Sequence, residues 1–326
     1  MTGQQIPAIS LRDFESRKEE IGRQLVDAAE KVGFFSVVDH VLSMEEIETQ
    51  FGVSENFFAL SPEEKAKVPF DVSTSLGYEN KAQFRPGTGF DQKESLFVRP
   101  GSEWPRDESV PGFAESTANF LAKCSQITDQ ILFCFGKALN FPDDYFKEAM
   151  DVSQPDCVNQ LRLLHYPAVE NSKGGWRHGS HTDIGALTLV FQRDGQDGLE
   201  VMPGRETHVS KAKGDNYFPI PAKTGPIVVN IGDMLMTVAW SDDRFKANFH
   251  RVRAKASGFS PARYSIGYFN MGRENFVFQG PNKKYPATTC GDYFHNHVKN
   301  QFEKHQGGKV DIVDVKTKLL AGIAVA

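Results

Sequence analysis

His181 and Asp183 stand two residues apart in a part of the chain rich in β-branched and aromatic residues. On an extended backbone, side chains two residues apart leave the same face, so this imidazole and this carboxylate could share one metal ion. His250, at the start of a later candidate strand, is the best candidate for a third ligand. Two imidazoles and one carboxylate predict the facial triad that holds non-haem Fe(II) and leaves coordination positions for a cosubstrate and dioxygen. A lone strand histidine is more often a core or surface residue, and the spacing alone leaves that alternative open.

Arg263 and Ser265 form a second pair with the same spacing, on a later candidate strand. An arginine guanidinium offers a planar fork of donors that matches a carboxylate, and a serine hydroxyl on the same face adds a third donor. Either pair alone is common by chance. The order His-x-Asp, His, Arg-x-Ser therefore favours a metal site beside a site for a carboxylate-bearing ligand.

The order of these motifs resembles the Fe(II)- and 2-oxoglutarate-dependent dioxygenases of the isopenicillin N synthase-like group. The resemblance covers nearly the whole chain, and although each motif is weak, the full set in order is specific. Besides the candidate ligands, the segments that carry it are residues 6–9 (IPAI), 33–35 (GFF), 39–41 (DHV), 57–60 (FFAL), 93–95 (KES), 161–167 (LRLLHYP), 229–233 (VNIGD) and 263–266 (RYSI).

The resemblance implies a role for each candidate residue. The implied iron ligands are His181, Asp183 and His250. It further implies that Arg263 and Ser265 bind the distal carboxylate of 2-oxoglutarate and that the phenol of Tyr166 also reaches this cosubstrate. The implied cofactors are Fe(II), 2-oxoglutarate and dioxygen, with ascorbate as an optional reductant. One departure is Leu164, which stands where plant members of the group usually carry asparagine.

The activity implied by the resemblance is oxidation of a small organic molecule by hydroxylation, desaturation, ring closure or ring expansion, in specialised metabolism. Residues 163–169 (LLHYPAV) also look like fungal nucleobase-oxidising members such as thymine dioxygenase. Two further functions stay open, namely an Fe(II) oxidase of the same fold that does not use 2-oxoglutarate, and a β-barrel binding protein with a zinc or empty site.

The elements that must position these residues divide the chain in two. Apolar residues recur at intervals of three and four over residues 11–66 and 109–150, which predicts helices, with a short buried strand at 33–38 and an isolated strand near 95–98. From residue 157 onward, short β-rich segments predict a jelly-roll sandwich or small barrel. These predicted strands are 160–166, 187–192, 199–202, 227–231, 234–238, 250–253, 264–269 and 276–278.

The predicted fold class is therefore α+β, and the resemblance specifies a double-stranded β-helix, a jelly-roll form, with an N-terminal helical region. We expect residues 1–156 to form that helical region, packed on the core. Residues 157–326 are expected to form the jelly-roll domain, including a C-terminal helix.

Composition limits the remaining classes. The 37 basic and 42 acidic residues give a net charge of -5, and no basic cluster suggests a nucleic-acid or membrane partner. We find no candidate membrane span or secretion signal and expect a cytoplasmic protein that binds a small-molecule substrate without an obligate protein partner. The four cysteines lack metal-binding or redox spacing and are expected to be reduced.

Several further residues are weaker candidates. Phe191, Trp240 and Phe269 could form an apolar wall around the iron, or could be ordinary core residues. His178 is predicted to be a loop histidine rather than a fourth ligand. The 66 residues between Asp183 and His250 include a polar segment, Arg205 to Asn216, which could be a lid or a passive surface loop.

Overall fold

The computed structural model describes residues 6–71, 74–80, 84–85, 89–172, 176–202, 217–236, 240–256, 258–294 and 296. Its centre is an eight-stranded sheet in the order β1-β2-β13-β10-β16-β7-β6-β3. β1 and β2 pair in parallel, and the other neighbours pair antiparallel. The strands are β1 (Ala8–Ser10), β2 (Phe34–Val38), β3 (Gly77–Asn80), β6 (Glu94–Val98), β7 (Gln160–Tyr166), β10 (Leu187–Gln192), β13 (Ile227–Ile231) and β16 (Arg263–Asn270).

A second sheet has the order β12-β11-β14-β9. Its strands are β9 (Trp176–His181), β11 (Leu199–Val201), β12 (Phe218–Pro219) and β14 (His250–Arg253). The two sheets pack on each other, because Leu164 and Tyr166 of β7 cluster with Val252 of β14. Two sheets of mainly antiparallel strands, backed by helices, confirm the predicted jelly-roll core of an α+β protein.

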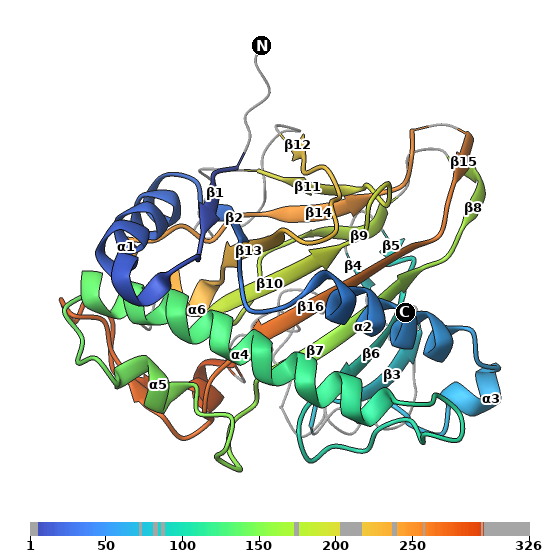
Figure 1. The fold of residues 1–326 in the computed structure, drawn as a ribbon, viewed down its shortest axis with the longest axis horizontal. Helices are drawn as coiled ribbons and strands as arrows, with labels where there is room; N and C mark the ends of the chain where they lie inside the picture. The colour runs from blue at the N-terminus through green and yellow to red at the C-terminus, as the bar shows by residue number, and fades with distance from the viewer. Residues whose placement is uncertain are drawn as a thin grey trace, which may run out of the picture.

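Three long helices cover the opposite face of the large sheet (Figure 1). They are α1 (Phe14–Lys31), α2 (Met44–Phe58) and α4 (Phe113–Ala138). In α4, Phe120, Cys124, Ile127 and Ile131 are buried and recur every three or four residues, so they form one apolar stripe. The ring of Phe120 lies 4.8 Å from that of Phe191 on β10, and this contact joins the stripe to the sheet.

Alternation along the strands gives the large sheet two different faces. Leu161, Leu163, Leu187 and Leu189 belong to the helix-side core. The residues between them turn toward the second sheet, and many of these are polar. Pairing between strands then sets Thr188 opposite both Asn230 and Phe269, Gln192 opposite Ser265, and Arg263 opposite Tyr166. The polar groups of four separate strands therefore gather between the two sheets.

The remaining elements are short and lie around the two sheets. They are α3 (Pro62–Lys65), α5 (Tyr145–Ala149), α6 (Asp233–Met236), β4 (Phe84–Arg85), β5 (Gly89–Phe90), β8 (Val169–Ser172), β15 (Gly258–Ser260), β17 (Val277–Phe278) and β18 (Thr288–Thr289). All four cysteines are free, as predicted. No helix among the described residues is long and apolar enough to cross a membrane.

The domain boundary that we propose at residue 156 falls between α5 and β7. The region before this boundary contains strands as well as helices, since four strands of the eight-stranded sheet come from it. Residues 290–294 are helical, but the chain beyond 296, where the predicted C-terminal helix would continue, lies outside the described residues. The segment Arg205 to Asn216 also lies outside them, so its role as a lid or a passive loop stays a prediction.

Two strand predictions need correction. The segment predicted as a strand at 234–238 begins with the helical turn α6, whose first amides donate to the backbone oxygens of Asp183 and Ile184. Met234, Leu235 and Met236 are all buried, and a run buried on every side shows no period that separates strand from helix. The strand near 95–98 is not isolated, because β6 pairs with both β3 and β7.

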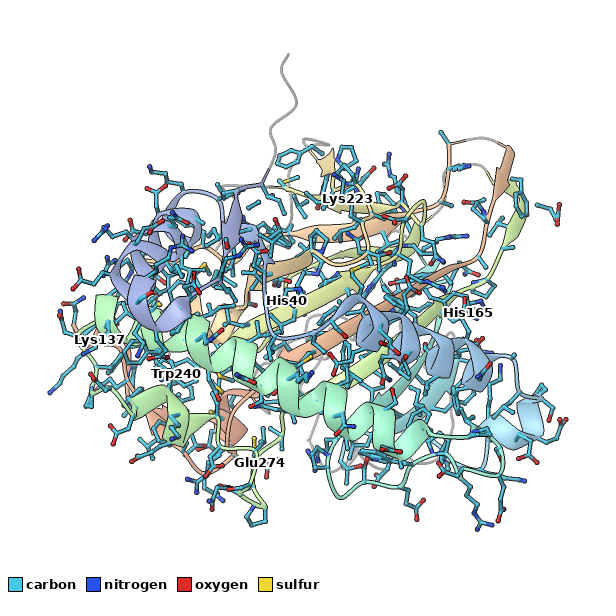
Figure 2. The ribbon with its side chains drawn as sticks, viewed as in Figure 1. His40, Lys137, His165, Lys223, Trp240 and Glu274 are labelled. Atoms are coloured by element: carbon cyan, nitrogen blue, oxygen red, sulfur yellow. The ribbon has the colours of Figure 1, made fainter. Side chains whose placement is uncertain are left out.

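Glu94 of β6 connects this strand to the helix-side core. It accepts hydrogen bonds from Lys65 Nζ at 2.9 Å and Tyr78 Oη at 2.5 Å, and His165 Nδ1 lies 2.7 Å away. His165, labelled in Figure 2, packs against Phe58 at the end of α2. Burial alone would raise the pKa of Glu94, but the hydrogen bonds outweigh it and lower the pKa to about 2.

Replacing Glu94 by glutamine is expected to lower the free energy of unfolding at pH 7 by roughly 3 kcal/mol, because it breaks a buried ion pair. A depressed carboxyl pKa stabilises the fold above the ordinary value of 4.5, and this stabilisation is lost as the pH falls toward 2. Urea unfolding between pH 7 and pH 3 should therefore show a steeper loss for the wild type than for Glu94→Gln. Equal slopes would contradict this assignment; Glu19→Gln, at an exposed position, is the control.

Candidate metal and carboxylate site

The three predicted metal ligands come together between the two sheets. His181 ends β9, Asp183 follows in the loop after it, and His250 begins β14 directly opposite His181 in the strand pairing. Asp183 Oδ1 lies 3.7 Å from Nε2 of each histidine. Candidate ligand atoms of all three lie within 4.8 Å of one another, and no other such group occurs in the described part of the chain. This donor set fits a divalent metal that prefers imidazole and carboxylate, such as Fe(II).

Each imidazole is oriented by a contact to Nδ1, the ring nitrogen that does not face Asp183. His181 Nδ1 lies 2.8 Å from the carbonyl oxygen of Gly179, and His250 Nδ1 lies 3.4 Å from that of Asn248. A backbone carbonyl accepts from a protonated Nδ1, which leaves the Nε2 lone pair free for a metal. Phe34 packs edge-on against the His250 ring at 5.6 Å.

Asp183 presents a single oxygen to the histidines. Its Oδ2 accepts hydrogen bonds from Thr188 Oγ1 at 2.7 Å and from Asn230 Nδ2 at 2.8 Å. Oδ1 is thereby left to face the two imidazoles. Sequence reasoning missed both positioning residues, although Asn230 belongs to the 229–233 motif that contributed to the resemblance.

Arg263 is a buried cation whose partners are neutral. Its side chain donates to Gln196 O at 2.9 Å, to Ser265 Oγ at 3.1 Å and to Gln192 Oε1 at 3.1 Å. The residue is 2% exposed, and no carboxylate among the described residues forms an ion pair with it. Burial lowers the pKa of this guanidinium. Tyr166 and the charge of Asp197 act against this lowering of the pKa, but Asp197 forms no ion pair with the guanidinium. A buried charge without a direct ion-pair partner is costly, so the site favours an anionic ligand.

Tyr166 lies beside this cation. The guanidinium carbon of Arg263 is 5.0 Å from the centre of the Tyr166 ring, across the β7–β16 pair. The phenol of Tyr166 and the guanidinium of Arg263 thus share one face. Arg162, on the same strand as Tyr166, instead pairs with Glu79 at 3.0 Å. Leu164, the departure from the group's pattern, lies in the small apolar cluster between the sheets.

Two of the three candidate wall residues are not at the site. Phe191 packs on α4, and Trp240 packs on Phe146 and Phe278, so both belong to the helix-side core. Phe191 alternates with the inward-facing Gln192, which explains its direction. Phe269 is half-buried opposite Thr188 and remains a candidate for the wall.

His178 is in strand β9, not in the predicted loop. Its ring stacks on that of His181 with centroids 4.0 Å apart, and its Nε2 lies 3.5 Å from Asp91 Oδ2. It is not one of the grouped ligands, as predicted. The sequence Gly179-Ser180 is typical of a loop, and only pairing with β14 makes this segment a strand.

Comparison with known proteins identifies the same chemistry. Residues 6–119 match the family model described as the N-terminal part of non-haem dioxygenases in morphine synthesis, and residues 157–271 match the 2OG-Fe(II) oxygenase superfamily. Proline hydroxylase buaE of Petromyces alliaceus is 31% identical over 280 residues, covering 79% of this chain and 83% of the relative. The 2-oxoglutarate-dependent dioxygenase frbA of Dothideomycetidae sp. is 28% identical, with 81% and 85% covered.

Among solved structures, a full-length Neurospora crassa protein in complex with alpha-KG aligns with a TM-score of 0.77 and 26% identity, covering 91% of this chain and 96% of that one. A second structure of the same Neurospora crassa protein contains alpha-KG and thymine and aligns with a TM-score of 0.74 and 27% identity, covering 91% and 97%. The chain therefore belongs to the Fe(II)- and 2-oxoglutarate-dependent oxygenase superfamily, as a dioxygenase that acts on a small molecule.

Proposed function

We propose that His181, Asp183 and His250 bind the Fe(II) of this dioxygenase and that Arg263 and Ser265 bind the distal carboxylate of 2-oxoglutarate. The observation that carries the proposal is the buried guanidinium of Arg263, whose hydrogen-bond partners among the described residues are all neutral and which turns toward the same space as the triad. Tyr166 borders the cosubstrate beside Arg263.

The two sites lie along one face of one strand. Thr188 contacts Asp183 and Gln192 contacts Arg263, and these two residues lie four apart on the same face of β10. A dicarboxylate between the sheets could therefore bind the metal through one end and the guanidinium through the other. 2-Oxoglutarate has a carboxylate at each end.

Bound Fe(II) would supply the activation of dioxygen that accompanies oxidative decarboxylation of 2-oxoglutarate. The chain's own residues set the conditions for that chemistry. Asp183 adds a negative charge that helps to hold the ion, and Thr188 and Asn230 fix which of its oxygens faces the ion. Leu164, Val252 and Phe269 border the space with apolar groups, which limits the access of water.

For the substrate, we propose a small organic molecule of specialised metabolism, and the relative named as a proline hydroxylase supports a substrate of small size. Oxidation of a nucleobase is the second candidate, because the Neurospora crassa protein has been solved with thymine and aligns over nearly the whole of this chain. We also propose that the protein acts in the cytoplasm without an obligate protein partner.

Succinate release is the test of this function. The protein with Fe(II), 2-oxoglutarate and dioxygen should form succinate, and a correct substrate should raise the rate above the substrate-free value. Proline and thymine are the first two compounds to compare, since they represent the two candidate classes. An Fe(II)-dependent oxidation that proceeds equally well without 2-oxoglutarate would instead identify an oxidase, and metal binding without any turnover would identify a binding protein.

A further inference from the structure

Asp91 and Lys93 form an ion pair that is almost completely buried. Lys93 Nζ lies 2.6 Å from Asp91 Oδ2, and the two side chains are 2% and 1% exposed. Removing two charges from water is costly, and replacing a buried pair by apolar residues is often neutral or stabilising. Stability alone therefore does not explain why this ion pair is present. The contacts that Asp91 makes with its surroundings suggest a different role.

The second oxygen of Asp91 holds the strand that carries the metal ligand His181. Asp91 Oδ1 accepts a hydrogen bond from the amide of Gly179 at 2.9 Å. The carbonyl oxygen of the same residue lies 2.8 Å from His181 Nδ1. Gly179 thus links Asp91 to the imidazole, with its amide fixed by the carboxylate and its carbonyl fixing the ring.

Asp91 also acts on the His181 imidazole through a contact with His178. His178 Nε2 lies 3.5 Å from Asp91 Oδ2, and the His178 ring stacks on His181 with an angle of 27° between their planes. Asp91 therefore touches both groups that limit the rotation of the His181 ring. Lys93 holds the carboxylate in place for both contacts.

We propose that Asp91, held by Lys93, is a positioning residue for the iron ligand His181. This inference rests on the proposed function. Asp91 lies in the stretch that matches the N-terminal family model, whereas His181 lies in the stretch that matches the oxygenase model. The N-terminal region thereby helps to build the metal centre of the other region, rather than only covering the sheet.

Two double variants separate the effect of the hydrogen bond between Asp91 and Gly179 from the effect of the charges on Asp91 and Lys93. Asp91→Asn with Lys93→Met removes both charges and keeps an acceptor for the Gly179 amide. Asp91→Leu with Lys93→Met removes the charges and the acceptor together. Affinity for Mn(II), used as a probe of the iron site, is measured by calorimetry, and thermal unfolding of the metal-free proteins is measured in parallel.

The Leu/Met variant should bind Mn(II) about 10- to 100-fold more weakly than the wild type, the typical effect of losing a group that orients a ligand. The Asn/Met variant should recover most of that affinity, and the metal-free Leu/Met protein should unfold at a temperature close to that of the wild type. If the leucine variant does not fold, Asp91→Ala with Lys93→Met removes the acceptor without added volume and replaces it.

Glu94→Gln is the matched control, because Glu94, which follows Lys93 in the chain, belongs to a separate buried ion pair with Lys65. It should lose stability and keep its Mn(II) affinity. Equal Mn(II) affinity in the wild type and the Leu/Met variant, or a loss that the Asn/Met variant shares in full, would overturn the inference about Asp91. Failure of the wild type itself to bind Mn(II) or Fe(II) would overturn the proposed function instead.

Discussion

Replacing His250 by alanine is expected to abolish succinate formation and to weaken Fe(II) binding by more than the roughly 100-fold that loss of an outer-shell partner can cost. The reason is geometric. His250 supplies one of the three grouped ligands and begins β14, whereas His181 ends β9 and Asp183 follows it. No other residue in the described part of the chain belongs to this group of ligands. His181→Ala and Asp183→Ala should behave alike. Metal titration and succinate assay measure the two effects separately.

The control for this prediction must be a histidine that is remote from the metal. His178 is unsuitable, because its ring stacks on His181 and its removal would disturb a ligand. His40 is suitable, since its Nε2 lies 2.8 Å from the carbonyl oxygen of Gly225 and it does not belong to the triad (Figure 2). His40→Ala should keep its iron. Retention of activity in His250→Ala would show that the third ligand has been misassigned.

The ligands themselves could be predicted because their chemistry is local. Arg263 and Ser265 share a direction because both lie in β16, as strand alternation predicts. His181 and Asp183 also come together, although β9 ends at His181 and Asp183 lies in the loop after it. Only His250 required a match between distant segments, and there the resemblance to a known family supplied the order of the motifs. The structure brings all three metal candidates together and sets Ser265 beside Arg263.

The supporting residues could not be predicted, because their roles depend on strand register. Thr188 and Gln192 are ordinary polar residues of a β-strand until β10 pairs with β13 and β16. Asp91 precedes β6 and meets Gly179 only because the chain folds back across 88 positions. Hydrogen bonds of this kind depend on tertiary packing, and no periodicity in the sequence predicts them.

The elements of the fold likewise divide into those that a local sequence pattern predicts and those that it does not. The helices could be predicted because an amphipathic stripe repeats over several turns, as in α4. Short strands such as β3, β8 and β15 were missed, since three or four residues at a sheet edge leave almost no pattern. The turn at α6 was mistaken for a strand because its three apolar residues are all buried.

Arg263→Lys is expected to weaken 2-oxoglutarate binding by about 1 to 3 kcal/mol, the usual contribution of a charge-assisted hydrogen bond. That loss corresponds to a roughly 5- to 160-fold change in affinity. The guanidinium is held on three sides by Gln196, Ser265 and Gln192, and this bracing leaves its planar fork in one orientation. A lysine has no fork and cannot satisfy the same three acceptors while it also contacts a carboxylate.

Burial increases the difference in charge between an arginine and a lysine at position 263. It lowers the pKa even of Arg263, and a lysine at this position would start from a lower value of about 10.4 and lose its charge more readily. Calorimetry of the Mn(II)-loaded protein with 2-oxoglutarate measures the affinity directly, and the KM for 2-oxoglutarate in the succinate assay should rise in parallel. Mn(II) affinity should stay near the wild-type value, because Arg263 contacts none of the three ligands.

Arg162→Lys makes the same chemical change on the neighbouring strand. Its guanidinium is paired with Glu79 from β3, so an anionic ligand is not needed to balance it. This variant should therefore keep its affinity for 2-oxoglutarate. An equal loss in both variants would show that any buried arginine between the sheets is required for packing. No loss in Arg263→Lys would show that the distal carboxylate of the cosubstrate binds elsewhere, and the buried charge of Arg263 would then require another anion.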